Sequence, residues 1–500
     1  METISPQAQL TFEQIEREGS ASRPLDFPPP RVARGVRVNA LVVHPGTGQR
    51  DILPGVIHRE SYTKPKDNEE VLISRKLIDT RKGLSQAGDD DGSSAKDLAG
   101  VTSSVEADEH YVESLNRLNR DASGGSILLP VEEDYVAYFP QRRLQDAIYG
   151  SVWACLVLKR HFGPAADDAA RAAGLKPGDK NAPIVWEIVG KHVAIKMIEW
   201  TRVHNARGRL LEDPVKEIAA MQLIGTEHPN VLGSMEVLQD DDYLFSVMPY
   251  AKGGDLFGYV VRDTELRGGD GGMQEGAARY WFKQILEVSV IYCFFFYKIK
   301  KSTTIVCLIS LNLLHYKQGL HFLQSKGICH RDLSLENILV DEDNCLVIDF
   351  GMCLRVPYTS SSDPSLISDV TKGSVRRLIK PMGTCGKHNY MSPEIFQNKE
   401  NFDGFAVDLW SAGVILYIML TGFPPYDQAT RADQRFEIIV EGQLMEQLRL
   451  WEINISDEAG DLMQSMLRLD PRQRLTLAQV MTHPWVTNPD VEFPTPDVLY

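Results

Sequence analysis

Three polar side chains in the second half of the chain have the types and spacing that phosphoryl transfer requires. Asp332 and Asn337 lie five positions apart in a run that begins at His330, directly before the apolar residues 338–340. Asp349 follows the next apolar stretch. Transfer of a phosphoryl group to an alcohol needs a carboxylate that accepts the hydroxyl proton, together with oxygen ligands for Mg²⁺. These carboxylate and amide side chains can supply both.

The same residues resemble the catalytic motifs of eukaryotic protein kinases. His330-Arg331-Asp332, with Asn337, matches the catalytic-loop pattern H-R-D-x-x-x-x-N, and Asp349-Phe350-Gly351 matches D-F-G. Either motif alone is common by chance, but the two in this order, each beside a predicted strand, are very specific. The resemblance implies that Asp332 is the catalytic base and that Asn337 and Asp349 bind Mg²⁺.

A lysine and a glutamate upstream match two further parts of the family pattern. Val193-Ala194-Ile195-Lys196 resembles the V-A-I-K strand, which implies that Lys196 contacts the α- and β-phosphates of ATP. Glu217 lies in a predicted helix that starts near Pro214, and it is the acid expected to pair with Lys196. Taken alone, each would be a surface residue.

The resemblance also predicts an ATP pocket. Residues 245–250 are similar to the family's hinge, Met248 is expected at the back of the adenine site, and Asp255 is expected to meet the ribose or a basic substrate side chain. The residues expected to contact the nucleotide are Gly150, Val152, Ala194, Met248, Tyr250, Asp255 and Leu339.

Later landmarks resemble the family's structural braces. Ser392-Pro393-Glu394 stands where the family has A-P-E, and Arg474 is expected to pair with Glu394. Asp408 lies in a stretch that is apolar nearly all round, which is typical of a helix buried at the centre of a lobe. We expect these residues to support the catalytic loop and to do no chemistry.

The Gly-rich loop departs from the family pattern. Gln145 and Ala147 occupy the first two glycine positions, and only Gly150 is kept. Those glycines let backbone N–H groups approach the phosphates closely. Their loss favours an alternative reading, a pseudokinase that binds nucleotide or acts as a scaffold. The intact catalytic residues favour an active serine/threonine kinase.

A second departure involves two residues beside Asp332. Ser334 stands where serine/threonine kinases carry a lysine, and Lys387 stands where the activation segment carries a threonine. We hypothesise that Lys387 reaches back over Asp332, keeps a cation beside the γ-phosphate and has Ser334 as its partner. The alternative is two unrelated substitutions.

Arg331, beside the expected base, indicates regulation by phosphorylation of the activation segment, because that arginine usually pairs with the phosphate. The candidate sites are Thr371, Ser374 and Thr384. An upstream activating kinase is therefore an expected partner, alongside the protein substrate.

These residues must be positioned by an α+β, two-lobed protein kinase fold. Residues 135–250 alternate short β-branched and aromatic runs, which predicts a small β-rich N-lobe, and 251–486 have helical periodicity, which predicts a larger helical C-lobe. Residues 487–500 form a short tail. The region 1–134 is rich in Pro, Asp, Gly and Ser, so we expect it to be mostly disordered, with docking or regulatory use. The patch 35–43 could form a strand, although nothing near it in the sequence could cover one.

Two insertions interrupt the kinase pattern. Residues 160–182 are rich in Ala, Gly, Asp and Lys and are predicted to be a surface loop. Residues 288–318 hold two apolar runs that are each too short to span a bilayer. Deleting them joins YWFKQILE to GLHFLQSKG in one amphipathic helix, and the edge residues Val-Ser and Gln can be encoded by GTA-AGT and CAG. We interpret this segment as a retained intron.

The overall composition limits the kinds of partner and the cellular location that we expect. A net charge of −15 argues against a general binder of nucleic acid or anionic membranes, since both need a basic surface. The seven cysteines are odd in number and have no C-x-x-C, so reduced thiols and a cytoplasmic location are expected. The N-terminus has no basic segment followed by an apolar run. We expect a monomer with ATP and Mg²⁺ as cofactors.

Overall fold

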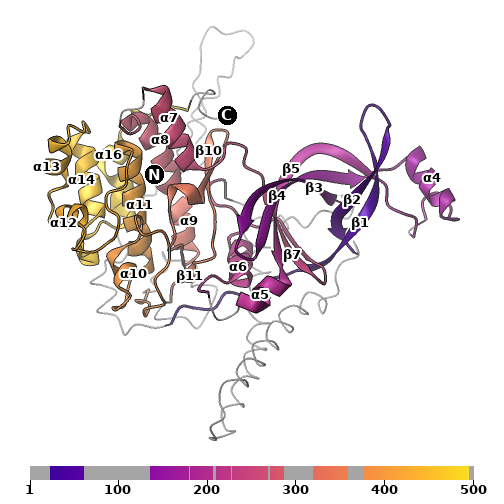
Figure 1. Cartoon of the computed structure of the whole chain (residues 1–500), viewed down its shortest axis with the longest axis horizontal. Helices are drawn as coiled ribbons and strands as arrows, with labels where there is room; N and C mark the ends of the chain where they lie inside the picture. The colour runs from indigo at the N-terminus through magenta and orange to yellow at the C-terminus, as the bar shows by residue number, and fades with distance from the viewer. Residues whose placement is uncertain are drawn as a thin grey trace, which may run out of the picture.

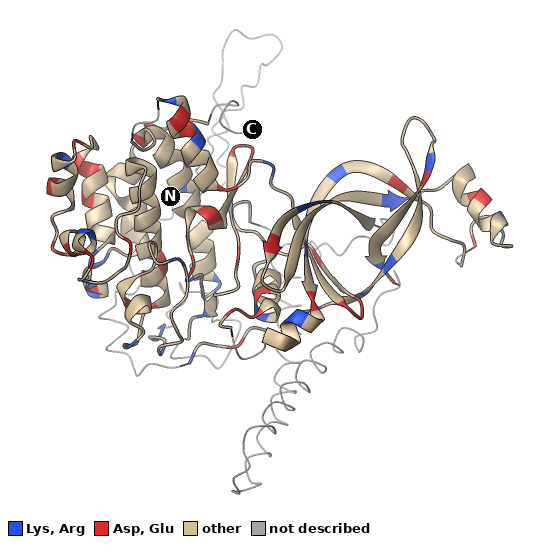
Figure 2. Ribbon diagram, in the orientation of Figure 1, with Lys and Arg blue, Asp and Glu red and all other residues tan. Residues whose placement is uncertain are grey.

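The chain forms a β-rich lobe and a helical lobe (Figure 1), which confirms the predicted α+β, two-lobed architecture. The computed structural model describes residues 23–60, 136–179, 181–206, 210–226, 228–268, 271–286, 319–357 and 376–494. Acidic and basic residues are spread over both lobes (Figure 2).

The N-lobe is a closed barrel with strand order β1-β2-β3-β4-β5-β7-β6. Inward-facing residues such as Ile57, Cys155, Ile195 and Phe245 form one of its hydrophobic clusters. The strands are β1 (Ala33–Val43), β2 (Arg50–Arg59), β3 (Val136–Ala147), β4 (Gly150–Arg160), β5 (Trp186–Glu199), β6 (Glu236–Gln239) and β7 (Tyr243–Pro249).

The first two strands correct the prediction that residues 1–134 are mostly disordered. β1 and β2 pair with each other, β1 also pairs with β6 and β5, and β2 pairs with β3. β1 and β2 are thus covered partly by each other and partly by strands that lie about 80 to 205 residues further along the chain. The N-lobe therefore begins well before residue 135, and residues 61–134 lie outside the described part of the chain.

The insertion at 160–182 contains a helix, α4 (Pro164–Ala172), where a loop was predicted. Pro164 occupies the first turn, where its missing N–H is not needed, and the alanines that follow have high helix propensity. Ala165 packs with Val43 of β1 and with Val185. The loop prediction was therefore wrong for these residues, because the Ala-rich run is sufficient to form one short helix.

Two helices follow β5 and lead to the cleft: α5 (Trp200–Ala206) and α6 (Pro214–Ile224). The side chain of Asp213 caps α6 by accepting hydrogen bonds from the backbone N–H groups of Val215 and Lys216. This cap fixes the first turn of α6, which carries Glu217.

The C-lobe is built around α11 (Gly404–Thr421), in which every residue is buried. This helix is long and apolar enough to cross a membrane, yet it lies wholly inside the protein. The other helices are α7 (Leu256–Leu266), α8 (Glu275–Leu286), α9 (Gly319–Ser325), α10 (Pro393–Gln397), α12 (Gln434–Val440), α13 (Leu444–Leu450), α14 (Asp457–Met466), α15 (Leu477–Thr482) and α16 (Pro484–Thr487).

Two small antiparallel sheets lie in the C-lobe and frame the catalytic loop. One pairs β8 (Ile328–Cys329) with β11 (Leu354–Arg355), and the other pairs β9 (Ile338–Asp341) with β10 (Asn344–Val347). The loop between β8 and β9 therefore has both ends fixed.

Helices α8 and α9 meet as consecutive turns of one helix would. A Cβ atom added to Gly319 would lie 2.7 Å from the carbonyl oxygen of Ile285 and 3.1 Å from that of Gln284. If residues 288–318 were removed, Ile285 and Gln284 would be three and four positions before Gly319, which are the helical neighbours. The segment itself lies outside the described residues. This junction agrees with the retained-intron hypothesis, which sequencing of the mature transcript would test.

Candidate active site

Lys196 and Glu217 form a buried ion pair between the β-sheet and α6. Lys196 lies near the C-terminal end of β5, and its Nζ is 2.7 Å from both carboxylate oxygens of Glu217. Burial disfavours the charged ammonium, but the carboxylates of Glu217 and Asp349 outweigh this and raise the pKa of Lys196. The expected pairing is thus present, and Asp349 is close enough to affect Lys196 as well.

Asp408 of α11 is hydrogen-bonded to the backbone of the catalytic loop. Its carboxylate accepts hydrogen bonds from the backbone N–H groups of His330, at 2.7 Å, and Arg331, at 2.8 Å. Arg331 has a positive φ of 68°. Such a conformation is costly for a residue with a Cβ, so the two bonds help to maintain it. They fix the direction in which Asp332 leaves the loop.

Asp332 lies in a partly desolvated position that suits a base. The pKa of Asp332 is raised to about 6, mainly by burial and also by Asp349, against the opposing effect of the Lys387 ammonium. Its Oδ1 is buried without a hydrogen-bond partner among the described residues. A carboxylate oxygen that lacks a partner inside a cleft is well placed to receive a proton from a substrate hydroxyl.

Asp349 is close enough to Asp332 to affect its pKa, and the residues around Asp349 fix its direction. Its backbone has a φ of 66°, and its Oδ1 accepts a hydrogen bond from the N–H of Gly351 at 3.2 Å. Phe350 is fully buried, with its ring centroid 5.0 Å from that of His330. The inward packing of Phe350 directs the Asp349 carboxylate towards Lys196.

The residues present fit Mg·ATP. The side-chain NH₂ of Asn337 donates to the carbonyl oxygen of Asp332 at 2.8 Å, so its amide oxygen is the atom left to accept a metal ion. Together with the Asp349 carboxylate, this is an all-oxygen donor set of the kind that Mg²⁺ prefers. Lys196 supplies a cation for phosphate oxygens.

Several residues expected to contact the adenine lie close together in the structure. Ala194 on β5 pairs with Met248 on β7, and both are buried in the main hydrophobic cluster, against which Val152 and Tyr250 also pack. Leu339 of β9 forms a backbone bridge to Asp255. Its neighbour Val340 exchanges backbone hydrogen bonds with Gly253 and Gly254. That these residues bind the nucleotide stays a prediction.

Asp255 and Gly150 have structural duties that the sequence did not indicate. The Asp255 side chain caps α7 by accepting a hydrogen bond from Gly258 N at 2.7 Å. A Cβ atom at Gly150 would lie 1.8 Å from the carbonyl oxygen of Met197, so glycine is required for packing of β4 on β5. Their proposed contacts with ribose, substrate or phosphate stay predictions.

Lys387 contacts Ser334, as hypothesised. Its Nζ lies 2.7 Å from Ser334 Oγ and 3.6 Å from a carboxylate oxygen of Glu336. Ser334 is completely buried, so the hydroxyl is a fixed partner. The ammonium is also close enough to Asp332 to influence its pKa. A cation is therefore present beside the base, although it comes from the activation segment and not from the catalytic loop.

Arg331 is engaged with the backbone of the activation segment. Its guanidinium donates to the carbonyl oxygens of Met352, at 3.3 Å, and Gly383, at 3.2 Å. Thr384, which directly follows Gly383, is exposed. The other two candidate phosphorylation sites, Thr371 and Ser374, lie outside the described residues.

Glu212 is a carboxylate of the cleft that sequence reasoning missed. Its pKa is raised to about 7, mainly by burial. The carboxylates of Glu217, Asp349 and Asp332 add to this rise, and Lys196 opposes it. A Cβ atom at Gly351 would lie only 2.7 Å from Glu212 Cγ. Nothing in the local sequence marks this residue, because its position depends on how α6 docks against the D-F-G motif.

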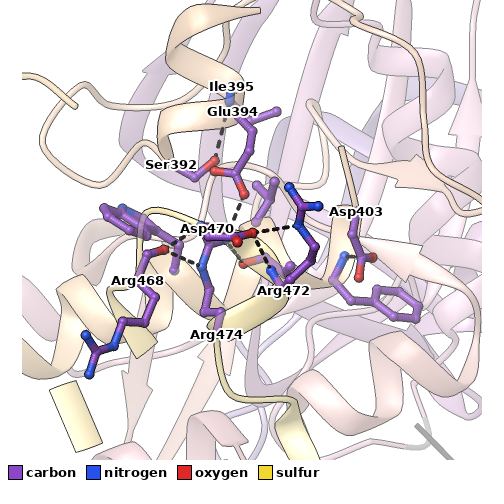
Figure 3. A network of polar contacts seen from close by, with 12 residues as sticks. Ser392, Glu394, Ile395, Asp403, Arg468, Asp470, Arg472 and Arg474 are labelled. Carbon is purple, nitrogen blue, oxygen red and sulfur yellow. Dashed lines mark hydrogen bonds and ion pairs between the residues drawn. The ribbon is translucent and has the colours of Figure 1, made fainter. Parts of the chain in front are cut away.

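The expected pair of Arg474 and Glu394 is present beneath the activation segment (Figure 3). Arg474 Nη1 lies 2.9 Å from a carboxylate oxygen of Glu394 and also donates to the carbonyl oxygen of Ala406. Its guanidinium carbon lies 4.9 Å from the ring centroid of Trp410. Ser392 caps α10 through a hydrogen bond from Ile395 N.

Comparison with known proteins shows that the chain is similar to protein kinases. The family model described as "Protein kinase domain" matches residues 307–486. CBL-interacting protein kinase 16 of Oryza sativa subsp. japonica is 30% identical over 297 residues, which are 59% of this chain and 51% of that protein. Serine/threonine-protein kinase DCLK3 of Mus musculus is 31% identical over 301 residues, 59% of this chain and 29% of that protein. A probable serine/threonine-protein kinase of Dictyostelium discoideum is 30% identical over 276 residues, 54% of this chain and 25% of that protein.

The chain thus spans about half the length of the first relative and less than a third of the other two. Lys196 and Glu217 lie outside the range that the family model matches, so their assignment depends on the geometry of the cleft. That geometry and the match to the catalytic half lead to one conclusion. Residues 307–486 match the protein kinase domain, and the described part of the chain has the two-lobed α+β architecture of that fold.

Proposed function

We propose that this chain is an ATP-dependent protein kinase that transfers the γ-phosphate of ATP to serine or threonine hydroxyl groups of proteins. The observation that carries the proposal is the Lys196–Glu217 ion pair, formed in the cleft that also holds Asp332, Asn337 and Asp349. A chain that had lost transfer activity would be under no pressure to keep all five groups in this arrangement. The serine/threonine relatives support the choice of hydroxyl class.

Each residue has a defined task in the proposed reaction. Asp332 accepts the proton of the substrate hydroxyl as that oxygen bonds to the γ-phosphorus, while the bond from this phosphorus to the β–γ bridging oxygen breaks and ADP leaves. Lys196 holds the phosphates, while Glu217 keeps the ammonium in place. Lys387 stabilises negative charge that develops on the transferring group. When bound, Mg²⁺ at Asn337 and Asp349 would supply further neutralisation of the phosphate oxygens.

A transfer assay tests this function directly. Transfer of γ-phosphate from Mg·ATP to a generic basic protein would be measured for the chain with and without residues 288–318, and mass spectrometry would identify the modified residue type. The control is Asp349→Asn, which removes a metal ligand with little change in shape. Transfer that disappears in the control supports an enzyme. If no transfer occurs while ATP still raises the melting temperature, the nucleotide-binding alternative is correct.

The pH dependence of the reaction should reveal the base. Because the pKa of Asp332 is raised to about 6, the carboxyl group is protonated below that pH and cannot accept a proton. We expect kcat/KM for a peptide to fall about tenfold per pH unit below roughly pH 6. Lys387→Met removes a cation that lowers this pKa, so its acid limb should move to higher pH. A limb that stays in place in this variant would contradict the assignment.

A double-mutant cycle tests whether Ser334 and Lys387 act together. Ser334→Lys alone would bring two ammonium groups together, and Lys387→Thr alone would leave the phosphate without its local cation. We expect each single change to reduce kcat, and the double variant to recover most of it. The coupling should be on the order of 0.5–3 kcal/mol, as found for residues in contact. Losses that simply add would show that the two substitutions are independent.

We further propose that Thr384 is a site of activating phosphorylation by an upstream kinase in the cytoplasm. Arg331 already donates to the carbonyl oxygen of Gly383, so a phosphate on the next residue needs little movement to reach the guanidinium. Thr384→Ala should abolish any increase in transfer that prior phosphorylation produces.

A further inference from the structure

A segment that precedes the first strand, residues 25–32, runs from the C-lobe to the N-lobe along α6. We call it the strap. At its C-lobe end the backbone N–H of Leu25 donates to the carbonyl oxygen of Arg355 at 3.0 Å, and Arg355 Nη1 donates to the carbonyl oxygen of Asp26 at 2.7 Å. Arg355 lies in β11, six residues after Asp349. The strap is therefore attached where the activation segment begins.

Just before its N-lobe end the strap is hydrogen-bonded to α6 through Gln222. The backbone N–H of Arg31 donates to Gln222 Oε1 at 2.7 Å, and Gln222 Nε2 donates to the carbonyl oxygen of Arg31 at 2.6 Å. Gln222 follows Glu217 by five residues, which places it on a different face of the helix. The helix is thus held by Lys196 on one side and by the strap on another.

At its N-lobe end the strap enters the hydrophobic core. Val32 is buried in a cluster with Ile218 of α6 and with Tyr149, which lies in the turn of the Gly-rich loop. The next residue, Ala33, begins β1 and pairs with Leu238 of β6. Strand pairing anchors this end, because moving it would require opening the barrel.

We propose that the strap is an intramolecular positioning element, and that Gln222 is its contact with α6. Catalysis needs the Lys196–Glu217 pair, and that pair exists only while α6 is docked. A strap attached to β11, to α6 and to the barrel restricts movement of the helix away from the sheet. Since the strap is covalently part of the chain, its local concentration is high and docking needs no second molecule. This inference rests on the proposed kinase function.

The test compares variants that weaken the strap at α6 without opening the barrel. Gln222→Ala removes both hydrogen bonds, and Gln222→Glu keeps only the acceptor for Arg31 N. Gln49→Ala, in the exposed β1–β2 turn, is the matched control. We expect kcat to fall about tenfold in Gln222→Ala, less in Gln222→Glu and not at all in the control. Hydrogen exchange at the α6 amides should speed up in the same order.

A deletion of residues 1–31 gives an independent measurement, because it removes most of the strap and leaves β1 intact. Its kcat should fall, and a synthetic peptide of residues 23–32 should restore it with saturable dependence on peptide concentration. Saturable rescue together with slower α6 exchange supports positioning, since a variant that was merely unstable would not recover.

Two results would contradict the proposed role of the strap. One is a kcat and an α6 hydrogen-exchange rate equal to those of the parent in both Gln222→Ala and the deletion variant. The other is a lower kcat with an unchanged α6 exchange rate. Failure of the proposed function is separable. In that case the parent chain itself shows no transfer, and α6 exchange with and without the peptide still decides whether the strap holds the helix.

Discussion

Replacing Asp332 by asparagine is expected to lower kcat by about 100- to 10,000-fold, the range found for removal of a general base. Asparagine has nearly the same shape but cannot accept the proton of the substrate hydroxyl. The Asp332 carboxylate accepts hydrogen bonds from the Lys387 backbone and the Asn337 side chain, and the amide oxygen of asparagine can still accept them. The melting temperature and KM for ATP should therefore change little.

The matched control is Asp241→Asn, which makes the same change at a side chain that is 85% exposed on the N-lobe. Its kcat should equal that of the parent. Steady-state kinetics with a peptide substrate, beside thermal unfolding of both variants, gives the comparison. A kcat for Asp332→Asn within a few-fold of the parent would remove Asp332 from the role of base.

Replacing Arg474 by leucine is expected to destabilise the protein by about 3–5 kcal/mol, the usual effect of removing one partner from a buried ion pair. The Arg474 side chain is fully buried, and that of Glu394 is only 11% exposed. The substitution leaves the Glu394 carboxylate without its partner and removes a donor to the carbonyl oxygen of Ala406. The midpoint of urea-induced unfolding measures the loss.

Two comparisons test the cause of that destabilisation. Arg472→Leu, two residues away, changes an exposed arginine paired with Asp470, and it should cost less than about 1 kcal/mol. Combining Arg474→Leu with Glu394→Leu removes both charges and should recover part of the lost stability. If the double variant is less stable than Arg474→Leu, the unpaired Glu394 charge is not the main cause of the destabilisation. Loss of packing or of the cation–π contact with Trp410 is then the larger cause.

The positions of the candidate catalytic residues could be predicted because short local patterns contain them. Asp332, Asn337 and Asp349 each lie beside an apolar strand, so the sequence around them specifies both the loop and its anchoring. The Lys387–Ser334 contact was predictable for another reason. Two residue types had exchanged places relative to the family pattern, and the chemical need for a cation beside the phosphate suggested that they meet.

The strand pairings of β1 and β2 could not be predicted from the local sequence, because the two strands are stabilised by partners far away in the chain. Ala33 pairs with Leu238, and Ile57 pairs with Tyr138, across stretches that local periodicity does not connect. Glu212 was missed for the same physical reason. Its environment is created by docking of α6 against Gly351, and no local pattern encodes such docking.

The closed barrel has a practical consequence for anyone who shortens this protein. A fragment that starts at residue 135, where the family resemblance begins, would lack β1 and β2 and would leave β3 and β6 as open strand edges. Open edges present unpaired N–H and C=O groups that recruit other chains. We expect such a fragment to aggregate more readily than the full chain, so an inactive preparation of it would not test the proposed activity of the full chain.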